Sequence, residues 1–106
     1  MRKTDKKVDN QLCEVLTDVC EAALKQCLGF QWLTHVANYN KFPKSLKVTC
    51  IFDTNDNVDN FIVTPGYDEL MSLIQQKLLS IGIRVNNIAD HISFDSEENR
   101  KRRGRK

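Results

Sequence analysis

The chain has 106 residues, of which 41% are hydrophobic and 28% are charged, and its formal net charge at pH 7 is +2. This length predicts a single domain, and the composition is that of a globular protein with one core. No apolar run is long enough to cross a membrane or to act as a secretory signal, so we expect a cytoplasmic protein without a membrane partner.

The first predicted element is an amphipathic helix over residues 5–28. Its apolar side chains recur at steps of three and four from Val8 to Cys27, and polar side chains fill the opposite face. Gly29 follows, at a position where a residue in the left-handed conformation commonly ends a helix.

Three of the four cysteines lie on this predicted helix. Cys13, Cys20 and Cys27 recur every seven residues, which puts neighbours about 10 Å apart along the helix axis. This distance excludes a disulfide between neighbours. No CxxC motif occurs either, so we expect no structural zinc site and interpret all four cysteines, including Cys50, as reduced, packed thiols.

Two strands are predicted next. Residues 30–39 are rich in strand-forming side chains, and residues 46–53 alternate between apolar and polar side chains, as a half-buried strand does. The short connection around Pro43 favours an antiparallel pair. Residues 54–60 are typical of a turn, and residues 61–63 of a short apolar turn or helix.

The rest of the chain predicts a second long helix, a strand and a charged tail. Thr64 and Pro65 are typical of a helix start, and Gly82 ends the helical pattern. Residues 88–95 suggest the last strand, which would complete a domain over residues 1–95. Residues 96–106 have no apolar face, so we expect a frayed helix or a mobile basic tail.

This order predicts an α+β fold in which two long helices pack on one face of a three-stranded sheet. The order of helix, strand, strand, short helix, helix and strand is also that of the type II KH and BolA-like folds, which is an analogy of topology alone. The GXXG loop with which nucleic-acid-binding KH domains clamp the nucleic-acid backbone does not occur in this sequence.

Four stretches of the sequence form a family signature. They are GFQWLTH at residues 29–35, FPKSLKV at 42–48, CIFDT at 50–54 and HISFD at 91–95. Together they resemble a family of small uncharacterised bacterial proteins, some of which carry the label "Fis family transcriptional regulator". The resemblance covers roughly residues 4–95 and implies no mechanism and no functional residues. A Fis-type protein reads DNA with a helix-turn-helix near its C-terminus, a region where this sequence predicts a strand and a charged tail.

The small net charge hides a separation of charge along the chain. Both ends are basic, and the part between them is acidic, so the ends attract phosphate while the body repels it. We therefore predict a non-enzymatic protein that binds nucleic acid or a nucleoprotein surface without reading sequence. The residues predicted to bind are Arg100, Lys101, Arg102, Arg103, Arg105 and Lys106, helped by Arg2, Lys3, Lys6 and Lys7.

One alternative interpretation and one feature of the composition limit this hypothesis. The basic tail is also typical of a solvated end that only keeps the protein soluble. No aromatic residue is interleaved with its charges, so the tail by itself offers no base stacking.

A second hypothesis is a homodimer or a protein–protein contact. The first strand has apolar residues on both faces, so helices on one side of the sheet would leave an exposed apolar patch on the other. The residues predicted for this interface are Trp32, Leu33, Tyr39 and Ile51. The alternative is that connecting segments cover them.

A third hypothesis is an enzyme or metal site. His35, Asp53, His91 and Asp95 are the polar residues whose chemistry would suit zinc binding or acid–base catalysis if the strands brought them together. Their spacing fits no ligand motif, and no GxSxG, P-loop or GxGxxG sequence occurs. We therefore expect no enzyme, no cofactor and no metal, and interpret these residues as surface polar groups at strand ends.

Overall fold

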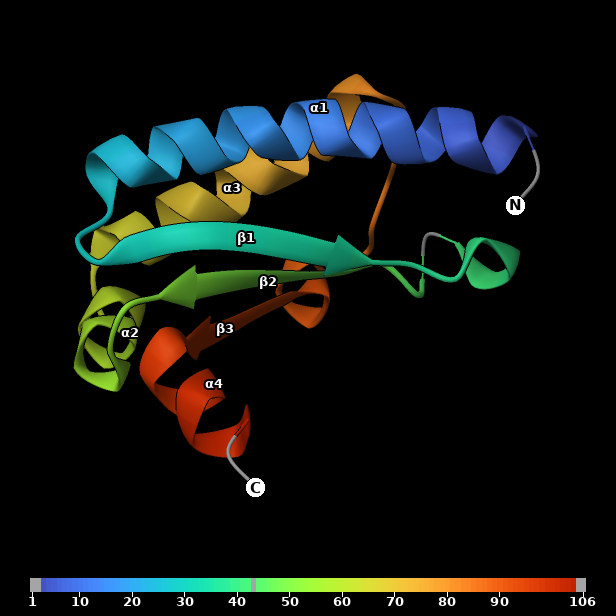
Figure 1. Ribbon diagram of the computed structural model, residues 1–106. Coiled ribbons are helices and arrows are strands. Elements are labelled where there is room, and N and C mark those ends of the chain that lie inside the picture. The colour runs from blue at the N-terminus through green and yellow to red at the C-terminus, as the bar shows by residue number, and fades with distance from the viewer. Residues whose placement is uncertain (1–2, 43, 105–106) are drawn as a thin grey trace.

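The computed structural model describes residues 3–42 and 44–104, and their fold is α+β with a three-stranded mixed sheet (Figure 1). The helices are α1 (Lys3–Gln26), α2 (Asn55–Ile62), α3 (Pro65–Ser80) and α4 (Glu97–Gly104). The strands are β1 (Phe30–Val36), β2 (Lys47–Phe52) and β3 (Ile92–Ser96), and two short 3₁₀ helices, η1 (Tyr39–Lys41) and η2 (Ile88–His91), lie in the connections. The predicted class and number of strands are confirmed. In the described ranges no helix has the length and apolar character needed to cross a membrane.

Strand β2 is the centre of the sheet. It pairs antiparallel with β1, as predicted, and parallel with β3. Its alternating pattern is confirmed, because Val48, Cys50 and Phe52 are fully buried in the core. The parallel pairing follows from the chain path, since α2 and α3 form the long crossover that a parallel neighbour requires.

The core lies between the sheet and the two long helices, which contact each other and run together along the sheet in Figure 1. Phe52 stands at its centre, with its ring centroid 5.6 Å from that of Phe30 and 5.1 Å from that of Phe61. Burial of apolar area is the main stabilising contribution here. The buried side chains of α1 and α3 that face the sheet are Leu12, Val15, Leu16, Val19, Ala23, Leu70, Met71, Ile74 and Leu78.

Strand β1 carries one irregularity that decides where its side chains point. Phe30 pairs with Phe52, but Trp32 pairs with Ile51, so the register shifts between Phe30 and Trp32. The extra residue, Gln31, makes a β-bulge, and side chains after a bulge face the opposite way from simple alternation. Beyond it, Leu33 packs against the core, and Trp32 is exposed on the other face of the sheet.

The prediction of a turn at residues 54–60 is wrong, because α2 begins there. The Thr54 side chain accepts a hydrogen bond from the Asn57 amide at 3.2 Å, which satisfies one of the free N–H groups at the start of the helix. Asn57 and its neighbours therefore continue as a helix whose apolar side chains, Val58 and Phe61, are buried.

Both glycines that were predicted to end the long helices adopt the left-handed conformation, Gly29 with φ +83° and Gly82 with φ +82°. They differ in their surroundings. A Cβ atom on Gly29 would lie 2.6 Å from both Asp53 Oδ1 and Asn57 Nδ2, whereas a Cβ on Gly82 would meet nothing within 4 Å.

The two glycines therefore form a matched pair for a stability measurement. Gly82→Ala should lower the free energy of unfolding by about 1–2 kcal/mol, the ordinary cost of a left-handed alanine. Gly29→Ala should cost about 1–3 kcal/mol more, because the new Cβ would force apart two side chains that are hydrogen-bonded to each other. Urea denaturation of both variants measures the difference, and equal losses would contradict the described packing around Gly29.

Candidate functional site

The two histidines of the predicted His/Asp site lie in different surroundings. His91 is buried in η2, not on the outer face of the last strand, and its Nδ1 lies 2.7 Å from the Leu46 carbonyl oxygen. His35, on β1, turns toward α1, where its Nε2 lies 3.2 Å from Asp9 Oδ1.

The two aspartates of that set also have local partners. Asp53 Oδ1 accepts hydrogen bonds from Thr54 N and from Asn57 Nδ2, each at 2.7 Å. The bond from Asn57 is the main reason why the pKa of the Asp53 carboxyl is lower than usual. Asp95 Oδ1 accepts from Ser96 N and from the Asn99 side chain. The carboxylates thus organise the starts of α2 and α4, and the structure does not bring the predicted set of four residues into one site.

The start of the charged C-terminal segment is bonded to the body of the protein. Ser96 Oγ accepts from the Asn99 amide at 2.9 Å, which caps α4, and donates to the Asn55 side chain. In return, Glu98 Oε1 accepts from the Asn55 amide at 2.9 Å, and the Glu98 amide donates to the Asp53 carbonyl at 3.2 Å. The first turns of α2 and α4 therefore satisfy each other's free N–H groups. These bonds fix the direction in which α4 leaves the sheet, away from α1 and α3 (Figure 1).

The predicted apolar interface is wrong for two of its four residues. Ile51 is 0% exposed. It lies between Trp32 of β1 and Asp95 of β3 in the sheet, and α4 packs beside both of these residues. Leu33 faces the helices as a consequence of the bulge. Trp32 is 39% exposed, as predicted. The Tyr39 side chain lies outside the described part of the structure.

Trp32 shares a hollow of about 210 Å³ with α4 side chains, namely Glu97, Arg100 and Lys101. Arg100 and Lys101 are exposed. The ion pairs described among residues 3–42 and 44–104 join His35 to Asp9 and Lys77 to Asp18, and neither involves these two cations. The fold thus places an aromatic ring beside the basic segment. Sequence reasoning missed this proximity because Trp32 lies far from the segment along the chain.

The remaining predicted cations divide into those that are described and those that are not. Lys6 and Lys7 are exposed near the start of α1, which runs on the side of the sheet away from α4 in Figure 1. Lys6 and Lys7 therefore do not share one surface with Arg100 and Lys101. Arg2, Arg105 and Lys106 lie outside the described residues, as do the side chains of Lys3, Arg102 and Arg103.

The structure also gathers three basic residues that the sequence had not singled out. Lys44, Lys47 and Arg84 line a hollow of about 400 Å³, together with Asp90 and His91. Lys47 Nζ donates to the Asp90 carbonyl at 2.8 Å, which orders this lysine along the rim. These residues are separated by some forty positions, so no local motif could have revealed the group.

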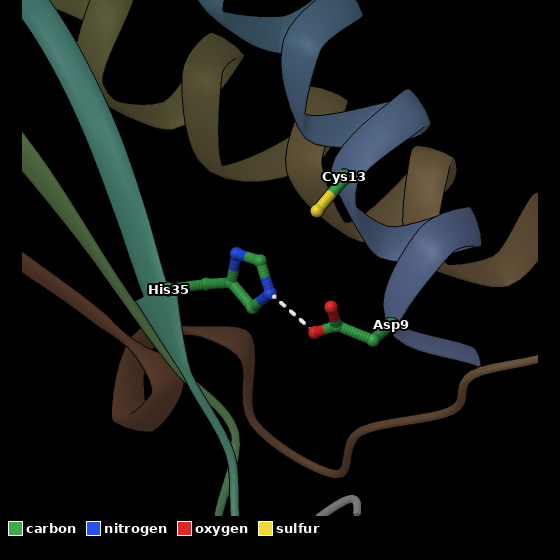
Figure 2. Close-up of side chains that lie close together, drawn as sticks. All are labelled: Asp9, Cys13 and His35. Carbon is green, nitrogen blue, oxygen red and sulfur yellow. Dashed lines mark hydrogen bonds and ion pairs between the residues drawn. The ribbon is translucent and has the colours of Figure 1, made fainter. Parts of the chain in front are cut away.

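The cysteines are all free thiols, and their surroundings differ. Burial raises the pKa of Cys50 to about 12, so this thiol stays protonated and unreactive at neutral pH. Burial also raises the pKa of Cys27, with a smaller contribution from Glu69. Cys13 is exposed, so the prediction of a packed thiol is wrong for this residue. It lies on the same face of α1 as Asp9, one turn further along the helix, and points toward His35 (Figure 2).

Comparisons with protein families, with curated proteins and with solved structures find no match to this chain.

The docking of α4 predicts a measurable loss on Ser96→Ala. This change removes the α4 cap and the bond to Asn55, so we expect the free energy of unfolding to fall by about 1–3 kcal/mol. Ser93→Ala, on the exposed side of the same strand, should change it by less than about 0.5 kcal/mol. Urea denaturation of both variants tests this, and similar values for the two would contradict the capping role.

Proposed function

We propose that the protein is a non-enzymatic binding protein that holds nucleic acid, without reading its sequence, on the surface formed by α4 and Trp32. The observation that carries this proposal is the hollow that the exposed Trp32 ring shares with Arg100 and Lys101. A basic segment beside an exposed aromatic ring is the combination with which proteins bind single strands.

The cations supply the attraction to phosphate. Arg100 and Lys101 are exposed and have no carboxylate partner among the described residues, so their charge is available to a ligand. Glu97 contributes one negative charge to the same hollow, and the two cations outnumber it. Four further basic residues follow in the sequence and add positive charge to this end of the chain: Arg102, Arg103, Arg105 and Lys106. Binding by such cations is independent of sequence and weakens steeply with salt.

The acidic body restricts where a nucleic acid can lie. Exposed carboxylates on the helices repel phosphate, so contact is favoured at α4 and disfavoured over α1 to α3. These carboxylates are Glu14, Asp18, Glu21, Asp56, Asp59, Asp68 and Glu69. The cations near the start of α1 provide a separate, weaker contact.

Trp32 supplies the aromatic stacking surface that the basic tail lacks. An indole ring can stack on any base, because every base has a π face, and such stacking contributes about 1–3 kcal/mol per base. Unpaired bases are accessible to a ring, whereas bases in a duplex are already stacked. The proposed ligand is therefore single-stranded DNA or RNA, either free or within a nucleoprotein.

Two predictions made from the sequence bear on this proposal, namely the KH-like topology and the family resemblance. The likeness of the element order to the type II KH and BolA-like folds remains an analogy of topology. The proposed surface would differ from that of a KH domain, because it uses α4 and the open sheet face in place of a GXXG loop. The resemblance to a family that includes proteins labelled as Fis-type regulators remains a prediction, and the proposal uses no helix-turn-helix.

The homodimer is the second candidate. Trp32 is accompanied on the outer face of β1 by Val36, which is 65% exposed, and β1 is an edge strand of the sheet. The unpaired N–H and C=O groups of an edge strand can pair with a second copy of the chain, and exposed apolar side chains on that strand favour the contact. Light scattering on the purified protein separates this candidate from the first.

Trp32 is the single tryptophan of the chain, so its fluorescence reports on the proposed site alone. Titration with a single-stranded oligothymidylate at low salt should quench it. Trp32→Ala should weaken binding about five- to hundredfold, as measured by fluorescence anisotropy of a labelled oligonucleotide, because one stacked base is lost. Trp32→Phe keeps a stacking ring and serves as the matched control. Unchanged affinity of the alanine variant would refute the role of Trp32.

Deletion of residues 100–106 should remove most of the affinity for nucleic acid at low salt. The segment contains six of the basic residues of the chain, and their loss should also flatten the dependence of the binding constant on salt. A charge-reversed Lys6→Glu/Lys7→Glu variant, with the tail intact, should lose much less. Equal retention of the truncated and full-length chains in a gel-shift assay would refute the proposal.

A further inference from the structure

Three side chains from α1 and β1 converge on the side of the sheet away from Trp32. They are Asp9 and Cys13 of α1 and His35 of β1 (Figure 2). The atoms that could act as ligands all lie within 4.8 Å of one another. Within residues 3–42 and 44–104, no other group of three or more His, Cys, Asp or Glu side chains meets this condition.

We propose that Asp9, Cys13 and His35 form a binding site for a divalent transition-metal ion, with Zn²⁺ as the best match. A thiolate, an imidazole and a carboxylate are the three ligand types that Zn²⁺ takes from proteins. The thiolate disfavours Mg²⁺ and Ca²⁺, which require oxygen ligands. This site is separate from the proposed nucleic-acid surface and goes beyond that function.

The local structure explains why these residues meet. Asp9 and Cys13 are four positions apart on a helix, so their side chains lie on the same face, one turn apart. The bulge in β1 turns His35 toward that face, since it pairs with the buried Val48 on the helix side of the sheet. The packing of α1 on β1 holds the two elements at the distance that the ligands need.

The distance between the imidazole nitrogen and the carboxylate oxygen is that of a tetrahedral site. Zn–N and Zn–O bonds of about 2.0–2.2 Å imply an N···O separation of about 3.3 Å, and a Zn–S bond of about 2.3 Å implies about 3.6 Å from sulfur to the other ligands. His35 Nε2 and Asp9 Oδ1 are 3.2 Å apart, which already matches. The Cys13 sulfur lies within 4.8 Å of the other two ligand atoms, so it must come closer to them to complete a tetrahedral set.

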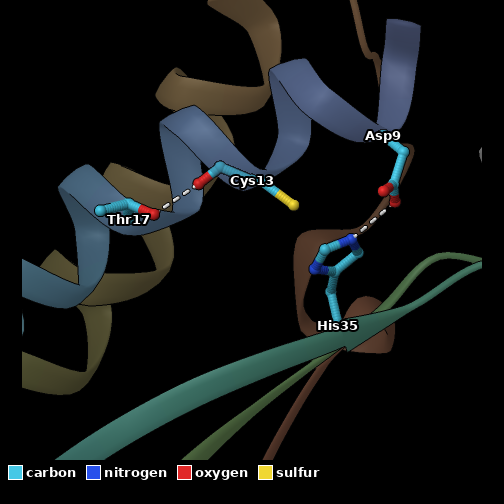
Figure 3. Close-up of polar contacts among 4 residues, drawn as sticks. All are labelled: Asp9, Cys13, Thr17 and His35. Atoms are coloured by element: carbon cyan, nitrogen blue, oxygen red, sulfur yellow. Dashed lines mark hydrogen bonds and ion pairs between the residues drawn. The ribbon is translucent and has the colours of Figure 1, made fainter. Parts of the chain in front are cut away.

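Figure 3 shows that the neighbouring polar contact does not compete for the sulfur. Thr17 Oγ1 donates to the backbone carbonyl of Cys13 at 2.6 Å, and the Sγ atom projects toward the space between α1 and β1. The only ion pair described for His35 is the one with Asp9, which directs its Nε2 toward the same space. The imidazole and the carboxylate are therefore oriented before a metal arrives.

The site is accessible from solvent. Cys13 is exposed, and the side chains of His35 and Asp9 are 17% and 35% exposed. Three protein ligands leave a fourth tetrahedral position for water or another small ligand, in contrast to closed structural zinc sites with four protein ligands. A metal could thus bind and leave without unfolding of the chain. Binding would link α1 to β1, and the stability of the folded state would rise with the logarithm of the metal concentration above the dissociation constant.

The test uses the reduced full-length chain and Co²⁺ as a spectroscopic substitute for Zn²⁺. We expect thiolate-to-cobalt charge-transfer absorption together with the ligand-field bands of a tetrahedral ion, both lost on addition of Zn²⁺. Cys13→Ser should abolish the charge-transfer band, and His35→Gln should weaken Zn²⁺ binding at least about tenfold in calorimetry. Cys20→Ser is the matched control on the same helix and should retain both signals.

A second measurement needs no variant and so does not depend on how a variant folds. Zn²⁺ should slow the alkylation of Cys13 in the wild-type chain at least about tenfold, because a metal-bound thiolate is a poor nucleophile, as read by mass spectrometry of the labelled peptide. Absence of the thiolate band, equal Zn²⁺ affinity of wild type and Cys13→Ser, or alkylation unaffected by Zn²⁺ would each overturn the proposal. Because Trp32 lies on the other side of the sheet, failure of the metal site leaves the oligonucleotide experiment unaffected.

Discussion

The bulge at Gln31 is the constraint on which both candidate sites depend. One extra residue in β1 shifts its register against β2, so that Trp32 pairs with Ile51 while Leu33 pairs with Cys50. From this shift onward, one face of the strand carries Trp32 toward α4, and the other carries His35 toward α1. Without the extra residue, each side chain beyond it would face the opposite way, and the indole would lie against the helices while the imidazole faced the open side of the sheet.

Much of the fold could be predicted from the sequence because its signals are local. Apolar periodicity located the two long helices, strict alternation located β2, and the glycines marked where the helices end. The start of α2 was missed because Thr54 was interpreted as part of a turn, and only its hydrogen bond to Asn57 distinguishes a helix cap from a turn residue. The bulge was missed for a related reason, since an extra residue leaves no mark in the composition of a strand.

The sites were harder to predict because their members are distant along the chain. Basic residues at the C-terminus were visible as a charge block, but their proximity to Trp32 depends on how α4 is docked by Ser96 and Glu98. His35 was singled out with the wrong partners, since its carboxylate is Asp9 and not a residue of the strands. A useful local signal existed, because Asp9 and Cys13 are spaced to share one face of a helix, although that spacing alone is common.

Strand β1 therefore contributes residues to both proposed sites, which lie on opposite faces of the sheet. On the helix side, a metal ion would link α1 to β1 by bonds to soft and borderline ligands. On the open side, a nucleic acid would be held by long-range attraction and stacking, which need exposure and no fixed geometry. Since β1 is paired with β2 at every position from Trp32 to Val36, a change at His35 has a short mechanical route to Trp32 along the strand. Because both residues follow the bulge, any coupling between the two sites would pass along this paired part of β1 and not through the bulge itself, whose effect is to decide which face each side chain occupies.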